Sequence, residues 1–388
     1  MKYFLILGKN KNLSLAEAVS LLKSRLDNPI SSDYGSFLIF ETDKEINFWN
    51  ELGGSIKFGQ VISDVKDINS LSAETFFPYL DKEKKNFFGI SFYRTASKRP
   101  DIFKLGMTLK RQFEEADIKI RLVTSKEETL SSVVVKTNKL LTRGLEAVIL
   151  DAGNKLFIGK TLAVQEFSDY EFRDYGRPGR DTLSGMIPPK LAKMMLNISG
   201  TEKDAVILDP FCGSGTIITE AAISGYKNLT GTDISEKAVE DTNKNIEWVK
   251  NEYRRPDTNY IIQHSDVRGI SKILAANSVD AIITEPYLGP PLHGNEREDT
   301  IQKNILELSD LYSAAFSELL KVVKKSGVLV IIIPFINIRE QKYYIKFDSA
   351  GWQEEKLTIN NKEIYPLIWS RPDQKVIREI KIYRKNSA

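Results

Sequence analysis

Three aspartates and a glycine-rich turn lie in one stretch of the chain and could together bind a charged nucleoside. Asp209 opens the segment Asp209-Pro-Phe-Cys-Gly-Ser-Gly-Thr216, Asp233 lies eighteen residues after Gly215, and Asp266 follows the next apolar run. The glycines let the backbone approach a ligand closely, and a helix that starts after them offers free amide groups. One carboxylate can hold an ammonium group, a second can accept both hydroxyls of a ribose, and a third can accept the amino group of an adenine. This ordered set predicts S-adenosylmethionine as the cofactor.

The glycine turn does not match the common phosphate-binding motifs. No lysine follows the glycines, which excludes a P-loop, and Ile218 stands where the dinucleotide fingerprint needs its third glycine. An aspartate at a strand end is often only a turn or a cap, so the set carries more weight than any one member. The predicted cofactor contacts also include neighbours of the aspartates, namely Phe211, Gly213, Gly215, Thr216, Ile234 and Val267.

These residues fall where strands and helices alternate. From the apolar patterns we expect strands at 205–208, 229–232, 260–263, 280–284 and 327–333, and helices at 188–199, 235–250 and 299–324. Such alternation predicts an α/β fold with a parallel sheet, in which ligands bind at the carboxyl ends of the strands. We therefore expect the three aspartates to lie along one edge of that sheet.

The first 165 residues follow another pattern. Strands are expected at 1–7, 37–40, 87–93, 118–123, 146–150 and 156–164, and helices at 13–22 and 101–116, which indicates an α+β region. Residues 166–187 are rich in Gly, Asp and Arg and are expected to form a surface linker. Its Arg173, Arg177 and Arg180 are available to phosphates in one interpretation and are paired with nearby aspartates in the other.

The charge distribution indicates where a polyanion would bind. The 388 residues include 55 Lys and Arg and 52 Asp and Glu, and the excess lies in residues 1–187, where 28 basic residues oppose 25 acidic ones. Residues 82–126 alone hold 12 basic and 5 acidic residues among several aromatic ones. This composition suits contacts with nucleic-acid phosphates, although solvated faces also carry such an excess. The candidates are Lys98, Arg99, Lys110 and Arg111.

The composition also excludes several classes of protein. One cysteine, Cys212, rules out an internal disulfide and multi-cysteine zinc sites, and with only two histidines we expect no metal. The apolar run Val328 to Ile336 has 9 residues, whereas a membrane span needs about 20. The N-terminal apolar run is too short for a signal peptide. We therefore expect a cytoplasmic protein without membrane contact.

Taken together, the motifs resemble those of the archaeal and eukaryotic tRNA guanosine N2-methyltransferases that act on guanosine 10. The matching segments are Leu130–Val135, Lys160–Glu166, Tyr170–Pro178, Ile187–Met194 and Asp209–Ile217. The resemblance covers nearly the whole chain. It implies a ferredoxin-like region at 1–65, a THUMP RNA-binding domain at 66–165, the linker at 166–187, and a Rossmann-fold class I methyltransferase domain at 188–388. Pro189 then belongs to a helix that covers the cofactor, and tRNA is the implied partner. Whether a small activating protein subunit is required stays open.

The chain departs from this family at its catalytic motif. Where the family has Asp-Pro-Pro-Tyr, this sequence has Glu285-Pro-Tyr-Leu288. An exocyclic amine is a poor nucleophile because its lone pair is delocalised into the ring. A carboxylate on Glu285 and the carbonyl of Pro286 could accept its two hydrogens and localise that pair. Tyr287 could stack on a base that has left its helix. Alternatively, this segment is an ordinary turn in an enzyme that acts on another acceptor.

The sequence therefore predicts a methyltransferase that acts on the N2 amine of a guanosine in tRNA. Two alternatives stay open. One is a DNA or rRNA amino-methyltransferase, because the cofactor and catalytic motifs do not specify the polymer. The other is a noncatalytic RNA-binding module whose altered Glu-Pro-Tyr segment no longer transfers a methyl group.

Overall fold

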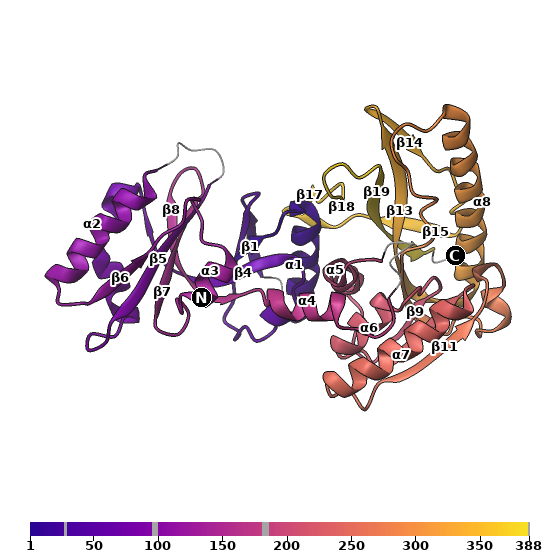
Figure 1. The fold of residues 1–388 in the computed structure, drawn as a ribbon, viewed down its shortest axis with the longest axis horizontal. Coiled ribbons are helices and arrows are strands. Elements are labelled where there is room, and N and C mark those ends of the chain that lie inside the picture. The colour runs from indigo at the N-terminus through magenta and orange to yellow at the C-terminus, as the bar shows by residue number, and fades with distance from the viewer. Residues whose placement is uncertain (27–28, 95–99, 181–185, 387–388) are drawn as a thin grey trace. The chain divides into compact units, whose positions relative to one another are not determined.

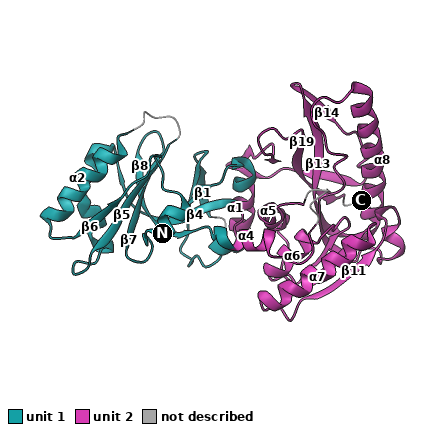
Figure 2. Ribbon diagram, viewed as in Figure 1, with its two compact units in different colours: residues 1–15, 25–50, 54–168 teal, residues 16–24, 51–53, 169–388 magenta. Residues whose placement is uncertain are grey.

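A computed structural model describes residues 1–26, 29–94, 100–180 and 186–386. The predicted RNA-binding residues Lys98 and Arg99 lie outside these ranges. The chain divides into two compact units (Figure 2). Unit 1 contains residues 1–15, 25–50 and 54–168, and unit 2 contains residues 16–24, 51–53 and 169–388.

Unit 1 is built on one mixed β-sheet (Figure 1). Its strands are β1 (Lys2–Leu7), β2 (Ile30–Asp33), β3 (Phe37–Glu41), β4 (Ser55–Val65), β5 (Asn86–Tyr93), β6 (Ile120–Val123), β7 (Gly144–Asp151) and β8 (Leu156–Val164). Their spatial order is β2-β3-β1-β4-β8-β7-β5-β6, with β5 parallel to both β6 and β7 and the other pairs antiparallel. One sheet thus contains strands from both predicted N-terminal regions, 1–65 and 66–165.

Helices and short 3-10 turns accompany this sheet. They are α1 (Lys11–Arg25), α2 (Ile102–Glu115), α3 (Ser132–Thr137), η1 (Trp49–Glu51), η2 (Ile68–Ser70) and η3 (Ala73–Tyr79). The predicted helix at 101–116 is confirmed as α2. Asp101 caps its first turn by accepting a hydrogen bond from the Lys104 amide. Leu109 and Phe113 of α2 are fully buried in the core of unit 1.

Unit 2 alternates strands with helices as the sequence predicts. The strands are β9 (Val206–Asp209), β10 (Asn228–Asp233), β11 (Asn259–His264), β12 (Val279–Thr284), β13 (Val323–Ile338), β14 (Gln341–Tyr344), β15 (Trp352–Glu355), β16 (Thr358–Ile359), β17 (Lys362–Glu363), β18 (Ile368–Trp369) and β19 (Val376–Lys385). The helical segments are α5 (Pro189–Ser199), α6 (Thr216–Ile223), α7 (Glu236–Glu252), η4 (Val267–Lys272) and α8 (Glu298–Val322). Helix α4 (Phe167–Tyr175) precedes them and lies within the predicted linker.

The strand order of unit 2 explains how the predicted site residues come together. The order is β11-β10-β9-β12-β13-β19-β15, with parallel pairing from β11 to β13 and antiparallel pairing of β19 to β13 and to β15. After β9 the chain continues to β10 on one side of the sheet, and after β12 it continues to β13 on the other side. Because β9 and β12 are adjacent, their carboxyl ends form the switch point where ligands bind in such sheets.

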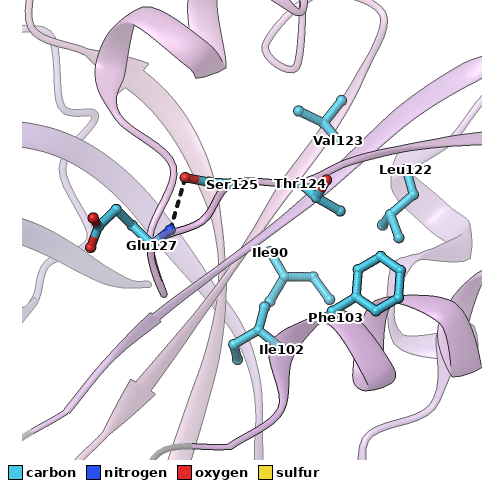
Figure 3. A pocket seen from close by; sticks show the side chains of 8 residues that line it. All are labelled: Ile90, Ile102, Phe103, Leu122, Val123, Thr124, Ser125 and Glu127. Carbon is cyan, nitrogen blue, oxygen red and sulfur yellow. Dashed lines mark hydrogen bonds between the residues drawn. The ribbon is translucent and has the colours of Figure 1, made fainter.

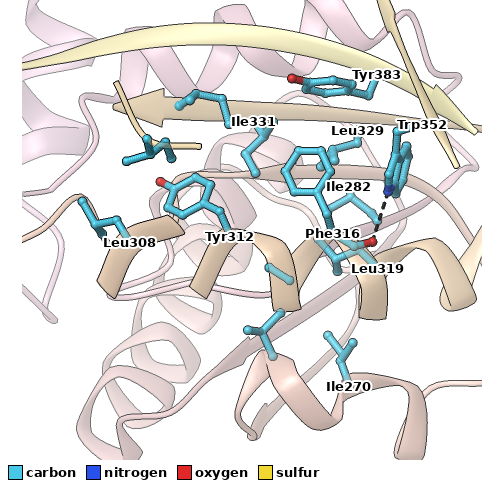
Figure 4. Packing of buried hydrophobic residues seen from close by; sticks show 14 of the residues in the cluster. Ile270, Ile282, Leu308, Tyr312, Phe316, Leu319, Leu329, Ile331, Trp352 and Tyr383 are labelled. Carbon is cyan, nitrogen blue, oxygen red and sulfur yellow. Dashed lines mark hydrogen bonds between the residues drawn. The ribbon is translucent and has the colours of Figure 1, made fainter. Parts of the chain in front are cut away.

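A long helix fixes one face of this sheet. The side chains of α8 that face the sheet recur at helical spacing, and Figure 4 shows Leu308, Tyr312, Phe316 and Leu319 packed toward Ile282, Leu329 and Ile331. Trp352 of β15 closes the cluster by donating its indole N–H to the Phe316 carbonyl at 3.1 Å. Such burial contributes about 1.5–3 kcal/mol for each large apolar side chain.

Among the described residues, no helix could span a membrane.

Candidate active site

The three predicted aspartates lie at the carboxyl ends of three neighbouring parallel strands. Asp209 ends β9, Asp233 ends β10, and Asp266 follows β11 and caps η4. The glycine turn runs from β9 into α6, and Gly213 and Gly215 both have positive φ angles, 51° and 81°. A side chain on Gly213 would point into open space, whereas one on Gly215 would meet Thr242 at 2.7 Å.

Two side chains of helix α7 form hydrogen bonds with the backbone of the glycine turn. Thr242 donates its hydroxyl to the Gly213 carbonyl at 2.7 Å, and Asn245 donates its amide to the Ser214 carbonyl at 2.7 Å. Both side chains are fully buried. Asn245 also forms two hydrogen bonds with Gly179, as acceptor for its amide and as donor to its carbonyl. The turn is thereby fixed by two side chains that the sequence analysis did not identify.

Asp209 is the most deeply buried carboxylate of this set. Its side chain accepts the Thr284 hydroxyl at 2.7 Å and the Phe211 amide at 3.2 Å. Burial raises its pKa to about 7, and the charges of Asp233 and Glu285 add to that rise. A buried carboxylate near other carboxylates favours a cationic partner, which agrees with the predicted contact to an ammonium group.

Asp233 and Asp266 are more accessible. Asp233 accepts the amides of Gly213 and Ser235, each at 2.9 Å, and an ionised carboxylate has about four acceptor positions, so lone pairs remain for a ligand. Asp266 accepts the Arg268 amide at 2.9 Å. Ile234 directly follows Asp233 and is 66% exposed. An exposed isoleucine directly after such a carboxylate offers an apolar surface for a flat ring.

The other predicted cofactor residues lie in four different segments of unit 2. Val267 is buried at the start of η4, Phe211 is partly buried against the core beside α8, and Thr216 begins α6. Pro189 is the first residue of α5, which ends at Gly200 with a φ of 66°, so the predicted helix from the two prolines to Ser199 is confirmed.

Glu285 follows β12 and forms a buried ion pair. Arg378 of β19 donates its Nε–H to Glu285 Oε1 at 2.5 Å, and the two side chains are 13% and 11% exposed. Burial raises the pKa of the Glu285 carboxyl, and the Arg378 guanidinium offsets part of that rise. Pro286 is buried, whereas Tyr287 is 57% exposed, as a side chain that stacks on a ligand must be.

Two of the predicted phosphate-binding arginines are buried within unit 2, which contradicts that role and favours the alternative that they pair within the protein. Arg173 pairs with Glu220 at 2.6 Å and with Asp169 at 2.7 Å. Arg177 donates to the Thr216 hydroxyl at 2.6 Å. Both guanidinium groups are used inside the protein, because helix α4 packs the segment onto α6 rather than leaving it on the surface. Arg180 is exposed, 5.0 Å from the Tyr175 ring.

The described candidates for RNA binding in unit 1 lie on α2. Lys110 and Arg111 pair with Glu114 and Glu115 at 3.5 and 3.8 Å, and exposed pairs of this kind are weak enough to exchange for phosphates. Beside the start of α2, an open depression is lined by Ile90, Phe103, Leu122 and five further residues (Figure 3). The Ser125 hydroxyl at its rim accepts the Glu127 amide at 3.1 Å. None of the predicted cofactor residues lines it.

Cys212 and the possible metal ligands raise a separate question from the carboxylates. Cys212 is buried under the glycine turn, and burial raises the pKa of its thiol, so it is a packing residue. Within the described ranges, no group of three or more His, Cys, Asp or Glu side chains is arranged to hold a metal ion.

Comparisons with known proteins agree with this geometry. The model of the RMKL-like methyltransferase domain family matches residues 177–341, and a DNA methylase family model matches residues 6–244. The structure of TrmN from Thermus thermophilus superposes with a TM-score of 0.58 at 12% identity and covers 100% of both chains. This likeness confirms the predicted mixed α/β fold class, and the matched family model supports a methyltransferase domain within it. The THUMP assignment of residues 66–165 stays a prediction.

Sequence relatives carry one recurring name. The tRNA (guanine(10)-N2)-dimethyltransferase of Pyrococcus abyssi (strain GE5 / Orsay) is 32% identical over 157 residues, 40% of this chain and 44% of that protein. "Probable tRNA (guanine(10)-N2)-dimethyltransferase" of Methanothermococcus thermolithotrophicus is 33% identical over 146 residues, 36% of this chain and 77% of that protein. The chain spans only 28–44% of the length of three relatives with this name. With the carboxylates and the glycine turn in the positions described above, these matches show that the chain belongs to the tRNA (guanine(10)-N2)-dimethyltransferase family.

Proposed function

We propose that this protein transfers a methyl group from S-adenosylmethionine to the exocyclic N2 amine of a guanosine in tRNA, at guanosine 10. One observation carries the proposal. Carboxylates lie at or shortly after the ends of four adjacent parallel strands. We assign Asp209, Asp233 and Asp266 to the cofactor, and Glu285 to the catalytic role that the family resemblance implies.

The residues present fit this cofactor. Asp209 is suited to the ammonium of the methionine part, Asp233 to the ribose, and Asp266 to the adenine amino group. The open space over Gly213 and the exposed Ile234 provide room and an apolar surface. When bound, S-adenosylmethionine supplies an activated methyl group on a sulfonium, whose carbon–sulfur bond would break on transfer and leave S-adenosylhomocysteine, a neutral thioether. The protein aligns the amine with that methyl group and excludes water from it.

Glu285 supplies the acid–base chemistry in this proposal. Its ionised carboxylate accepts one hydrogen of the guanine amine, and the Pro286 carbonyl accepts the other, so the nitrogen lone pair becomes available. As the new bond between nitrogen and carbon forms, Glu285 takes the proton that the amine loses. Tyr287, which is exposed beside Glu285, stacks on the base.

Unit 1 is the part that we assign to tRNA. It carries the basic excess of the chain, and Lys110 and Arg111 on α2 are candidates for phosphate contacts. A cytoplasmic location accords with such a substrate. A small activating protein subunit becomes part of the proposal if the purified chain binds tRNA and cofactor without turnover.

The test is methyl transfer to tRNA with isotopically labelled cofactor, followed by mass spectrometry of the released nucleosides. We expect label in N2-methylguanosine or N2,N2-dimethylguanosine. Glu285→Gln should keep its cofactor affinity and lose about a hundredfold or more in turnover. Equal turnover in the two proteins would remove Glu285 from the chemistry. Label in another nucleoside would overturn the choice of target.

A second candidate acceptor is the amino group of a DNA base. The DNA methylase family model matches residues 6–244, which include the glycine turn and two of the three aspartates. Duplex DNA offered in the same labelling assay distinguishes the two acceptors. Label in DNA and none in tRNA would favour this alternative. Binding of tRNA without any label would favour the noncatalytic module, provided that the activating subunit has also been supplied.

A further inference from the structure

The pairing partner of Glu285 comes from a distant part of the chain. Arg378 lies on β19, opposite Pro334 of β13 and Trp369 of β18, and 93 residues after Glu285. Its Nε–H donates to Glu285 Oε1 at 2.5 Å, and both side chains are nearly buried. The antiparallel strand β19 thus brings a cation to the carboxyl edge of the parallel strands.

We propose that Arg378 is a positioning residue that holds one oxygen of Glu285 so that the other oxygen faces the amine to be methylated. The inference rests on the proposed function. Among the described residues, Arg378 is the side chain that donates a hydrogen bond to the Glu285 carboxylate, and it occupies Oε1. Oε2 therefore remains as an acceptor, and an ionised carboxylate can accept at both oxygens.

The charge of Arg378 matters as much as its geometry. Among the residues that the structure describes, the charged or titratable groups that interact with Glu285 are Arg378 from β19, Asp209 from β9 and Tyr312 from α8. Burial raises the pKa of the Tyr312 hydroxyl well above its ordinary value, so it stays neutral. Arg378 is thus the cation that opposes the burial of Glu285. Without it the carboxyl would be protonated more readily and could not accept a hydrogen from the amine.

This arrangement also accounts for the departure from aspartate in the family motif. A glutamate is longer than an aspartate by one methylene, about 1.5 Å. That length lets the carboxylate meet the guanidinium of β19 in this chain. We therefore expect Glu285→Asp to break the pair and to lose activity, even though aspartate is the residue that the family motif carries.

The experiment compares Arg378→Gln, Arg378→Lys and the wild type in methyl transfer to tRNA at saturating cofactor. The matched control is Arg384→Gln, because Arg384 lies on the same strand and donates its Nε–H to Glu355 at 2.6 Å, away from the site. Affinity for S-adenosylhomocysteine and the melting temperature report whether each variant is folded.

In Arg378→Gln we expect kcat to fall about tenfold or more, while KM and affinity for S-adenosylhomocysteine change little. The acidic limb of its pH profile should move to higher pH. Arg378→Lys keeps the charge without the planar fork, so it should restore most of the pH profile and only part of kcat. Arg384→Gln should match the wild type.

A double substitution separates positioning from a general structural effect. If Arg378 acts through Glu285, adding Arg378→Gln to Glu285→Gln should cost no further activity. A further loss of the same size in the Glu285→Gln background would overturn the inference, as would wild-type kcat and pH profile in folded Arg378→Gln. A wild-type protein that labels DNA and leaves tRNA unlabelled would instead refute the proposed function, and the inference with it.

Discussion

Cofactor affinity should depend on pH through Asp209, because the buried carboxyl must be ionised to hold an ammonium group. Its pKa is raised to about 7 by burial. At pH 5.5 about 3% of the ligand-free protein would then carry the charge, and at pH 7.0 about half would. A ligand that needs the ionised form binds in proportion to that fraction. The apparent Kd for S-adenosylhomocysteine should therefore fall about 16-fold over this interval, equivalent to about 1.6 kcal/mol.

The assay is isothermal titration with S-adenosylhomocysteine at several pH values between about 5.5 and 7.0. An α-amino group has its pKa near 8, so the ammonium of the ligand stays largely protonated in this range. Asp209→Asn should bind more weakly and show a flat profile. Any slope that persists in Asp209→Asn belongs to other groups. An equal slope in wild type and variant would refute the reasoning.

The same carboxyl should affect stability with the opposite sign. A carboxyl whose pKa is raised by folding contributes stability that is fully present below its ordinary value near 3.8 and is lost as the pH rises through about 7. The ligand-free wild type should therefore lose this contribution on going from acidic to neutral pH, and Asp209→Asn should not. Melting temperatures across that range give the comparison.

Three further substitutions test other parts of the site. Asp233→Ala should weaken binding of S-adenosylhomocysteine by about 1.5–3 kcal/mol in calorimetry, the usual value for hydrogen bonds to a charged group; unchanged affinity would mean that the ribose binds elsewhere. Asn245→Ala should weaken the same binding by about 1–3 kcal/mol because the glycine turn loses its support. Asn243→Ala is its control, since that side chain donates to the Val239 carbonyl within α7, and equal effects of the two would contradict this role. Replacing Lys110 and Arg111 by Ala should weaken tRNA binding and flatten its salt dependence without changing cofactor affinity; an unchanged salt slope would exclude α2 from the interface.

Much of unit 2 could be predicted because its strands are short apolar runs that end at turn residues. The expected strands at 229–232 and 280–284 are confirmed as β10 and β12 with boundaries within one residue. An apolar run between turns needs no information from elsewhere in the chain. The three aspartates followed directly, because the carboxyl ends of such strands share one edge.

The features that were missed depend on partners far along the chain. Strand β4 was not predicted because Lys57 and Gly59 interrupt its apolar pattern. Lys57 is fully buried in the structure, where it pairs with Glu146 of β7. Arg378 was missed for the same reason, since nothing near it in sequence indicates a carboxylate. A local pattern cannot reveal an ion pair that only the strand order creates.

The buried contact between Arg173 and Glu220 determines where this chain can be cut and rejoined. A chimaera that joined a foreign RNA-binding region at residue 187 would discard Arg173 and leave Glu220 as a buried charge without its guanidinium, which is strongly destabilising. A junction before Phe167 would keep α4 and both charges together. When N-terminal regions are exchanged between proteins of this architecture, α4 should therefore be kept together with unit 2.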